Sequence, residues 1–370
     1  MKTCLNGFVF FMMSFILMPI YAHQTSTSFI DVTQQHESVS FDLKLPVIDL
    51  HYKLDLDVNL DGQITWDEIK LNNNVISQFV VQHVSLRLGD SQCRYRQDPL
   101  QLESILDSSY LVIHAESMQC ESTKNDLSVS YTAFFDMNSE HRALLKYHTD
   151  EVEQSLLFSP NATQHRLTMT SHGLETFWQF IGEGIWHIFV GYDHILFLLS
   201  LLLTSVLVRQ AGQWQAVDNS TVVFMDSIKV VSAFTIAHSI TLSLVVLGVV
   251  SLPTQWVESM IALSVILVAL NNLYPIFTNK RWLMAFAFGL IHGFGFANVL
   301  QALQFNQQSL LAALAGFNIG VEFGQLVIVV LFMPIAYVLR GTTSYQTLGV
   351  KVGSLCIGVF GMVWLVERLA

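Results

Sequence analysis

Charged residues are scarce in this chain of 370 residues, and basic residues are the scarcer kind. Only 13% of the residues are Asp, Glu, Lys or Arg, whereas 52% are hydrophobic. This composition is too apolar for one soluble globule. The 18 Lys and Arg residues are outnumbered by 29 Asp and Glu residues and form no basic patch. We therefore predict that the protein has no nucleic-acid partner.

Motifs of the common enzyme classes are also missing. The sequence contains no H-E-x-x-H, no G-x-S-x-G and no P-loop pattern. No motif therefore assigns the chain to the zinc proteases, the serine hydrolases or the nucleotide-dependent enzymes. The sequence favours a function other than these standard forms of catalysis.

The charges that are present are distributed unevenly along the chain. Residues 23–170 contain 21 acidic and 10 basic residues, whereas residues 171–370 contain 8 acidic and 7 basic residues. This change in composition predicts an acidic soluble domain, followed by an apolar domain that is almost neutral.

The N-terminus has the pattern of a secretory signal peptide, predicted to span residues 1–22. Lys2 forms a short positive region, residues 8–18 form an apolar core, and Ala22 ends a suitable cleavage site. An uncleaved membrane anchor is the alternative, because the apolar core is long. Cleavage after Ala22 would place His23 first, where a terminal amine and an imidazole together can chelate copper or nickel.

Cysteine is rare, and the four cysteines fall into different segments. Cys4 belongs to the predicted signal peptide, and Cys356 lies in an apolar segment near the C-terminus. Cys93 and Cys120 are then the only pair in the exported domain. An oxidising compartment favours a disulfide between them. Two free thiols are the alternative.

The exported domain, residues 23–170, contains several short runs of alternating apolar and polar residues, such as SVSFDLKL, SYLVIHAE and LSVSYTAFF. Such runs, bounded by Asp, Asn, Ser or Gly, are typical of strands. They predict a small β-sandwich-like domain.

One segment of this domain, DVNLDGQITWDE at residues 57–68, fits the loop pattern of an EF-hand. Gly62 stands at the position of the sharp turn, and both flanking segments can be helical. The predicted calcium ligands are Asp57, Asn59, Asp61, Gln63, Thr65 and Glu68. A single exported loop of this kind predicts weak binding, on the order of 10⁻⁴–10⁻³ M, with a structural role. A turn rich in Asp and Asn is the alternative.

The apolar half predicts an α-helical polytopic membrane bundle. Residues 171–184 are amphipathic and predict an interfacial helix, and residues 185–370 form the transmembrane domain. About six transmembrane helices are expected in it. They cover residues 185–208, 228–251, 256–277, 282–302, 309–338 and 347–366.

Basic residues in the loops predict the orientation of this bundle. If the first span runs inward, the inner loops carry Arg209, Lys229, Lys280, Arg281 and Arg340, whereas the outer loops between spans carry no Lys or Arg. This bias is the positive-inside pattern. It predicts a multi-pass protein of the inner (cytoplasmic) membrane, with the N-terminal domain on the periplasmic side and lipid as a partner.

Polar residues within the apolar spans are the strongest functional signal. His187 and His194 are seven residues apart, which predicts that they share one face of a continuous helix. The predicted metal ligands are His187, Asp193, His194, His238, His292 and Glu322. Further polar residues in the spans are Ser239, Glu258, Asn318 and Gln325. Gly289 and Gly293 form a pair that allows close helix packing.

Imidazoles and carboxylates together suit divalent transition metals such as nickel, cobalt or zinc. Each ionisable group alone is costly in a membrane, about 2.5–3.5 kcal/mol on the translocon scale. A shared cation would offset that cost, so the set predicts one intramembrane metal site. Separate hydrogen bonds between helices are the alternative.

The pattern His187-x5-Asp193-His194, with Gly191 between, resembles the first-span signature of the HupE/UreJ family. AHSITL, FGLIHGFGFA and FNIGVEFGQ resemble later segments of the branch that carries an N-terminal exported domain. The resemblance covers about residues 170–370. It implies a nickel or cobalt permease, and it implies metal binding by the two histidines and the aspartate of the signature.

Three functions are compatible with these features. The first is a transporter that passes a divalent metal through the histidine cluster. The second is an intramembrane zinc hydrolase, with water on the metal and Asp193, Glu258 or Glu322 as the base. The third is a membrane sensor or assembly factor that acts through the exported domain. A transporter needs polar groups that reach both membrane faces, whereas an enzyme needs one closed cluster with an open side.

Overall fold

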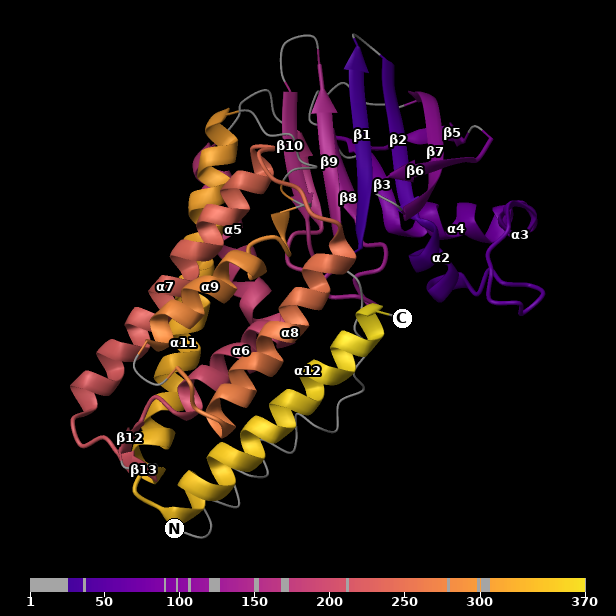
Figure 1. The fold of residues 1–370 in the computed structure, drawn as a ribbon. Helices are drawn as coiled ribbons and strands as arrows, with labels where there is room; N and C mark the ends of the chain where they lie inside the picture. The colour runs from indigo at the N-terminus through magenta and orange to yellow at the C-terminus, as the bar shows by residue number, and fades with distance from the viewer. Residues whose placement is uncertain are drawn as a thin grey trace. The chain divides into compact units, whose positions relative to one another are not determined.

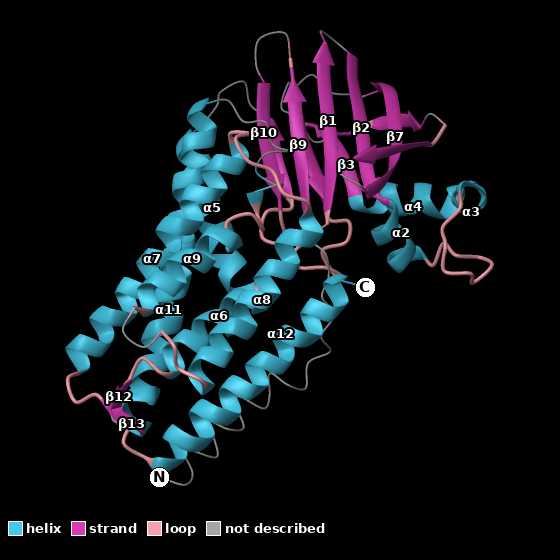
Figure 2. Ribbon diagram, viewed as in Figure 1, coloured by secondary structure: helices cyan, strands magenta, loops and turns pink. Residues whose placement is uncertain are grey.

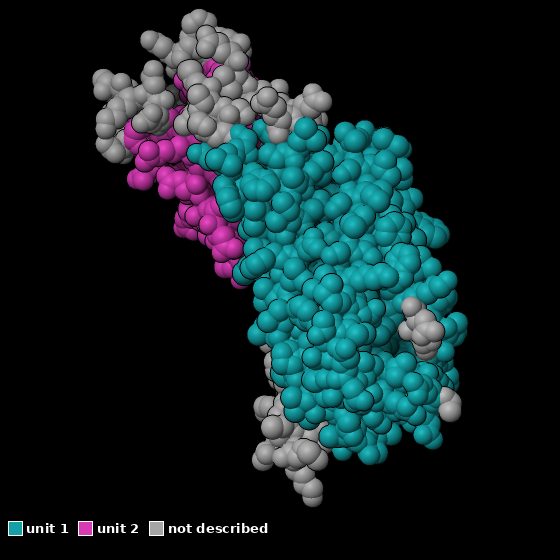
Figure 3. All heavy atoms as spheres, turned by 90° about the vertical axis from the view of Figure 1, so that its left-hand side faces the viewer, with its two compact units in different colours: residues 1–22, 173–301, 308–370 teal, residues 23–172, 302–307 magenta. Residues whose placement is uncertain are grey.

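The computed structural model describes most of the chain in two compact units. One unit comprises residues 1–22, 173–301 and 308–370, and the other comprises residues 23–172 and 302–307 (Figure 3). The described residues are 26–35, 38–89, 91–97, 99–105, 108–119, 127–149, 153–167, 173–210, 213–277, 280–297, 300 and 307–369. The predicted signal peptide, His23 and Cys120 lie outside them.

The first unit along the chain is rich in strands, as predicted (Figure 2). One sheet has the order β10-β9-β1-β2-β7-β5, with β6 also paired to β7, and a second has the order β11-β8-β3-β4. Only the β1–β9 pair is parallel among these pairs of described strands. The strands are β1 Thr27–Gln35, β2 Ser38–Pro46, β3 Val84–Leu88, β4 Ser91–Gln92, β5 Arg94–Gln97, β6 Gln101–Ile105, β7 Ser108–Gln119, β8 Leu127–Tyr131, β9 Arg142–His148, β10 Glu153–Phe158 and β11 Gln164–Leu167.

Alternation in the sequence explains how these strands pack. In β2, Phe41, Leu43 and Leu45 are fully buried, and the residues between them are partly exposed. Successive side chains of a strand point to opposite faces, so this pattern buries one face of the sheet. Val129 and Tyr131 of the second sheet belong to the same core cluster. The two sheets therefore share one hydrophobic core.

Three helices connect β2 to β3: α2 Val47–Leu54, α3 Trp66–Leu71 and α4 Asn73–His83. The loop at residues 57–68 begins after α2 and extends into α3. Thr65 caps α3, because its side chain accepts a hydrogen bond from the backbone of Glu68 while the Glu68 side chain accepts one from the backbone of Thr65.

The second unit is helical (Figure 1). Its elements are α5 Gly173–Val190, α6 Tyr192–Leu203, the hairpin β12 Leu207–Gln210 and β13 Gln213–Ala216, α7 Ser220–Val246, α8 Thr254–Leu273, α9 Arg281–His292, α11 Gln307–Leu339, the π-helix η2 Tyr345–Val352 and α12 Gly353–Leu369. Among the described residues, four helices are long and apolar enough to cross a membrane. The bent pair formed by α5 and α6 makes up to five.

Two of the six expected spans differ from the prediction. Most of the expected interfacial helix at residues 171–184 and the first six residues of the expected span at 185–208 form one continuous helix, α5. Gly316 and Gly320 of α11 lie against the backbone of α5 at Phe177 and Ile181, where any larger side chain would clash. Close packing of this kind holds the amphipathic segment within the bundle.

The expected span at residues 282–302 is likewise shorter. Helix α9 ends at His292 after 12 residues, and turns follow at 293–296. Twelve residues rise about 18 Å, less than the thickness of about 30 Å of a hydrocarbon core. The predicted close packing at Gly289 and Gly293 is confirmed, because a Cβ on either would lie 2.6 Å from a backbone oxygen of α7.

Candidate metal centre

A helix break at Gly191 builds one side of the candidate site. Helices α5 and α6 meet there at an angle of 70°. A Cβ at Gly191 would lie 2.7 Å from the backbone oxygen of His187 and 2.9 Å from Nδ1 of His194. Only glycine fits without displacing one of them. The prediction that His187 and His194 share a face of one continuous helix is therefore wrong, since they belong to different helices.

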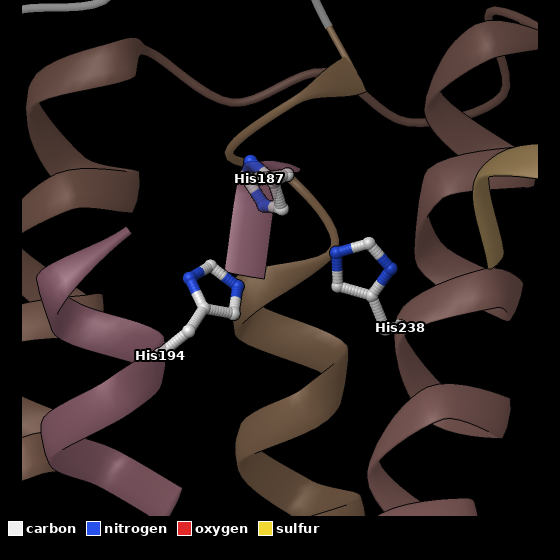
Figure 4. A group of neighbouring side chains, drawn as sticks. All are labelled: His187, His194 and His238. Atoms are coloured by element: carbon white, nitrogen blue, oxygen red, sulfur yellow. The ribbon is translucent and has the colours of Figure 1, made fainter. Parts of the chain in front are cut away.

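The break nevertheless brings the two histidines together and adds a third from α7. The ring centroids of His187 and His194 are 4.6 Å apart, and each is 6.4 Å from the ring of His238. One potential ligand atom from each of the three lies within 4.8 Å of the other two. Figure 4 shows the three rings turned toward a common space. This trio forms the first candidate ligand group.

A second group shares His194 with the first. It consists of Asp193, His194 and His292, whose ligand atoms also lie within 4.8 Å of one another. The rings of His194 and His292 are 4.9 Å apart. The structure thus brings together five of the six predicted metal ligands, from α5, α6, α7 and α9.

Hydrogen bonding fixes which nitrogen of His194 can bind a metal. Its Nδ1 lies 2.9 Å from Oδ1 of Asp193. A carboxylate only accepts, so the Nδ1 hydrogen donates to it and the lone pair is on Nε2. That Nε2 is buried and has no hydrogen-bond partner within the described part of the chain. A carboxylate that holds a histidine in this way is the usual support of a metal-binding imidazole.

His238 is oriented by an amide. Its Nδ1 lies 3.4 Å from Oδ1 of Asn318. The Asn318 Nδ2 group donates to the backbone oxygen of Leu314 at 2.8 Å, which turns the amide oxygen toward His238. The Nδ1 of His238 therefore donates, and its Nε2 carries the lone pair. This Nε2 is also buried, with no hydrogen-bond partner among the described residues.

Ser264 of α8 orients His292 in the opposite sense. The Ser264 hydroxyl donates to the backbone oxygen of Ile261 at 2.6 Å, so its oxygen accepts from Nε2 of His292 at 3.0 Å. The lone pair of His292 is then on Nδ1, which lies 3.9 Å from Oδ2 of Asp193. Two electron-rich atoms face each other there, an arrangement that a cation between them would stabilise.

The ends of two short helices meet at this site. Helix α6 begins at Tyr192 and places Asp193 in its first turn, whereas α9 ends at His292. The positive end of a helix dipole favours the carboxylate, and the negative end favours a cation. Interrupted helices that meet in this way are common at the ion sites of transporters.

Aromatic rings enclose the histidines. His187 lies 5.3 Å from Phe296 and 5.4 Å from Phe317, and these two phenylalanine rings stack at 4.4 Å. Phe234 stacks on His238, with the centroids 6.1 Å apart. An apolar enclosure lowers the local dielectric, which strengthens the attraction between a carboxylate and a metal ion.

Glu322, the sixth predicted ligand, belongs to neither ligand group within the described residues. Its Oε1 accepts a hydrogen bond from Ser232 at 2.7 Å. Among the other polar residues, Glu258 pairs with Arg368 at 3.1 Å, and Gln325 accepts from Thr235 at 3.3 Å. Ser239 donates to a backbone oxygen of its own helix. Only Asn318 of these secondary residues contacts the metal centre.

Sequence reasoning missed the contact by which Ser264 orients His292, and it missed the burial of Glu183. Ser264 gave no signal, because a serine in an apolar span has many ordinary roles. Glu183 is 5% exposed on α5, four residues before His187. Residues four apart lie on one face of a helix, but the prediction of an interfacial helix at 171–184 hid this relation.

The loop at residues 57–68 has the turn that its sequence predicts. Gly62 has φ of +80°, a conformation that favours glycine. The carboxylate of Asp57 accepts from the backbone N–H of Gly62 at 2.8 Å, and that of Glu68 accepts from the backbone N–H of Val58 at 3.1 Å. Hydrogen bonds from Thr65 hold the pKa of the Glu68 carboxyl below its ordinary value.

Cys93 is buried at the edge of the strand-rich core. Its neighbour Arg94 pairs with Gln119, the residue before Cys120, in the β5–β7 ladder. Since Cys120 lies outside the described residues, the disulfide stays a prediction.

The predicted inner basic residues make contacts at one end of the helical unit. Arg340 donates to the backbone oxygen of Val217, the residue after β13, at 2.8 Å. Arg281 pairs with Asp226 at 3.0 Å, and Lys229 lies over the ring of Trp282. We call this the cationic end.

Comparison with known proteins gives a family match. No curated protein matches the chain. Residues 163–368 match the family described as HupE / UreJ protein. The matched segment contains the described helices of the helical unit, apart from Leu369 at the end of α12, together with the residues of the metal centre, and it is more than half of the chain. With four membrane-length helices among its described residues, the chain is a multi-pass membrane protein that belongs to the HupE/UreJ family.

Proposed function

We propose that the protein transports a divalent transition metal, of the nickel, cobalt or zinc type, through the centre formed by His187, His194 and His238. The observation that supports this most directly is the pair of buried Nε2 atoms on His194 and His238, both aimed into the shared space. Membership of the HupE/UreJ family, whose members are regarded as nickel or cobalt permeases, points the same way.

The donor set suits such a cargo. Neutral imidazoles bind nickel, cobalt and zinc well. Asp193 supplies one negative charge next to His194, so a cation at the centre offsets the cost of burying that carboxylate. Acid should weaken binding, because an imidazole must be neutral to act as a ligand.

Transport is favoured over hydrolysis by what surrounds the centre. A zinc hydrolase needs an open coordination position with a base beside it. Glu258, one predicted base, is paired with Arg368. Polar side chains instead continue from His238 along the interface between α7 and α11, as a path for an ion requires.

The test combines metal analysis with uptake. The wild-type protein, purified in detergent, should retain nickel, cobalt or zinc and should take up that metal when reconstituted in liposomes. His194→Ala should lose both bound metal and uptake. His114→Ala, a half-buried histidine of the strand-rich unit bonded to Asp42, is the matched control and should retain both. Stoichiometric zinc without uptake by the wild type would favour the hydrolase.

We propose in addition that residues 1–22 are a cleaved signal peptide and that the strand-rich unit is periplasmic, with the bundle in the inner membrane. An oxidising periplasm would allow a Cys93–Cys120 disulfide. Mass spectrometry of non-reduced peptides should find the two cysteines linked. Recovery of both as free thiols would contradict this.

We also propose that the loop at residues 57–68 binds calcium weakly. Its support is the positive φ of Gly62 together with the burial of Asp57 and Glu68, which are 8% and 5% exposed. Calcium would replace backbone N–H groups as the partner of these carboxylates and would stabilise the α2–α3 region.

A further inference from the structure

A line of polar side chains connects α7 to α11 and begins at the metal centre. His238 faces Asn318 at 3.4 Å, Thr235 donates to Gln325 at 3.3 Å, and Ser232 donates to Glu322 at 2.7 Å. On α7, the three contributing residues are spaced three apart and so form one stripe. We call these three pairs the polar seam.

The seam leads toward the cationic end. On α7, the order from His238 through Thr235 to Ser232 approaches Lys229 and the start of the helix at Ser220. On α11, the order from Asn318 through Glu322 to Gln325 approaches Arg340, which bonds to Val217 just before α7. Both helices therefore carry their polar residues from the histidines toward the same face of the membrane.

Glu322 is the only carboxylate of this seam, and it differs from other acidic residues of the helical unit. Asp226 is paired with Arg281, and Glu258 with Arg368. Glu322, by contrast, has no ion pair with a described residue, and its identified partner is the neutral hydroxyl of Ser232. A partly buried carboxylate without a counter-ion is costly in a membrane. A cation in transit would neutralise it.

We infer that Glu322, with Ser232, forms a second cation site, distinct from the histidine centre, through which the metal passes on its way to the cationic end. This inference rests on the proposed transport function. Glu322 is thus assigned to movement of the ion and not to its retention. Its carboxylate attracts the ion away from the imidazoles, and Thr235 lies between His238 and Ser232 on α7.

The experiment measures binding and movement separately in the full-length protein. Glu322→Gln keeps an oxygen that can accept from Ser232 but removes the charge. Metal retained in detergent should stay within about twofold of the wild type, whereas the initial rate of uptake into liposomes, with the same metal, should fall at least tenfold. Glu322→Asp, which keeps the charge, should recover a measurable part of the rate. Glu175→Gln, at an exposed carboxylate of α5, is the matched control and should take up metal normally.

Each other result overturns the assignment. Loss of bound metal in Glu322→Gln, with a normal elution profile, would make Glu322 a ligand of the histidine centre. Uptake at the wild-type rate would reduce the seam to helix packing. Equal loss of uptake in Glu322→Gln and Glu322→Asp would show that the charge is not what matters. Failure of the wild type itself to take up metal would overturn the proposed transport, and the assignment of Glu322 with it. The uptake assay of the wild type alone distinguishes this outcome from a failure of the Glu322 assignment.

Discussion

Gly191 is the residue on which the shape of the metal centre depends most closely. It ends α5, allows the 70° bend, and leaves room for His187 and His194 on either side. A methyl group there would contact both the backbone oxygen of His187 and the ring of His194. The absence of a side chain at Gly191 thus allows the bend that brings His187 and His194 together.

Gly191→Ala should therefore lower the metal retained by the purified protein about tenfold or more, because even a displacement of about 1 Å is enough to spoil a preorganised site. Gly182→Ala is the matched control on the same helix, since a Cβ at Gly182 would meet no atom within 4 Å. Metal content measured by elemental analysis checks both. Full retention by Gly191→Ala would mean that the bend does not set the ligand geometry.

At the scale of single residues, the sequence predicted which candidate ligands lie close together better than it predicted the geometry that brings them together. Ionisable residues in apolar segments are costly, so His187, Asp193, His194, His238 and His292 could be singled out without coordinates. Glu322 satisfied the same criterion but pairs with Ser232. The criterion detects burial in a membrane; it does not tell which buried groups meet.

Among the elements, the short helices were hardest to predict. Hydropathy extends unbroken through residues 185–203, so the break at Gly191 gives no signal in a sliding window. The break depends on tertiary packing, in which Gly184, Gly316 and Gly320 hold α5 against α11. Strands of the other unit were easier, because the alternation in β2 specifies its buried face locally.

The loop between α2 and α3 gives a prediction about calcium. At a calcium concentration ten times Kd, binding should stabilise the strand-rich unit by about 1.4 kcal/mol, from RT ln(1 + [Ca]/Kd). Glu68→Gln should abolish the corresponding thermal shift, because it removes the bidentate carboxylate. Asp67→Asn, at an exposed neighbour with 85% side-chain exposure, should keep it. Identical melting of the wild type in calcium and in chelator would leave the loop as a turn only.

Buried His141 gives a prediction about pH. Its Nε2 lies 2.8 Å from the hydroxyl of Tyr131, its Nδ1 lies 3.5 Å from Asp49, and the residue is fully buried. Burial lowers the pKa of His141 below its ordinary value. The unfolded chain, with a histidine pKa of about 6.5, then takes up a proton before the folded one does. Stability should be unaffected above pH 6.5 and should fall as the pH drops below it, by at most about 1.4 kcal/mol per pH unit.

Hydrogen exchange of the β8 amides, corrected for the intrinsic rate, measures this effect locally. Protection should decrease between pH 7 and pH 5.5 in the wild type, and less so in His141→Gln. His165, whose pKa burial also lowers, remains in that variant, so a residual dependence on pH is expected. An unchanged slope in His141→Gln would assign the effect to other groups.

For the whole molecule, the positions of basic residues predict the orientation in the membrane. Contacts of Arg340, Arg281 and Lys229 lie at the cationic end, which the positive-inside pattern predicts to be cytoplasmic. Gln213 lies at this end in the β12–β13 hairpin, and Ser251 lies in the loop between α7 and α8. Both are exposed.

In a Cys356→Ser background, an impermeant maleimide should label Ser251→Cys in intact cells and should label Gln213→Cys only after the membrane is broken. The reverse result would invert the topology and place the seam on the outward side of the metal centre. Labelling of both in intact cells would mean that the hairpin is not cytoplasmic.

The shortness of α9 also has an electrical consequence. The helix has 12 residues between the cationic end and His292, a length of about 18 Å in a hydrocarbon layer of about 30 Å. A cation held by the histidines would thus have more than half of the transmembrane voltage still to cross. A membrane potential that is negative inside is worth about 2.3 kcal/mol per charge per 100 mV. At 100 mV, a divalent ion that starts from this depth would therefore gain about 3 kcal/mol on moving inward. The cell's membrane potential would then act mainly on the inward step that follows binding.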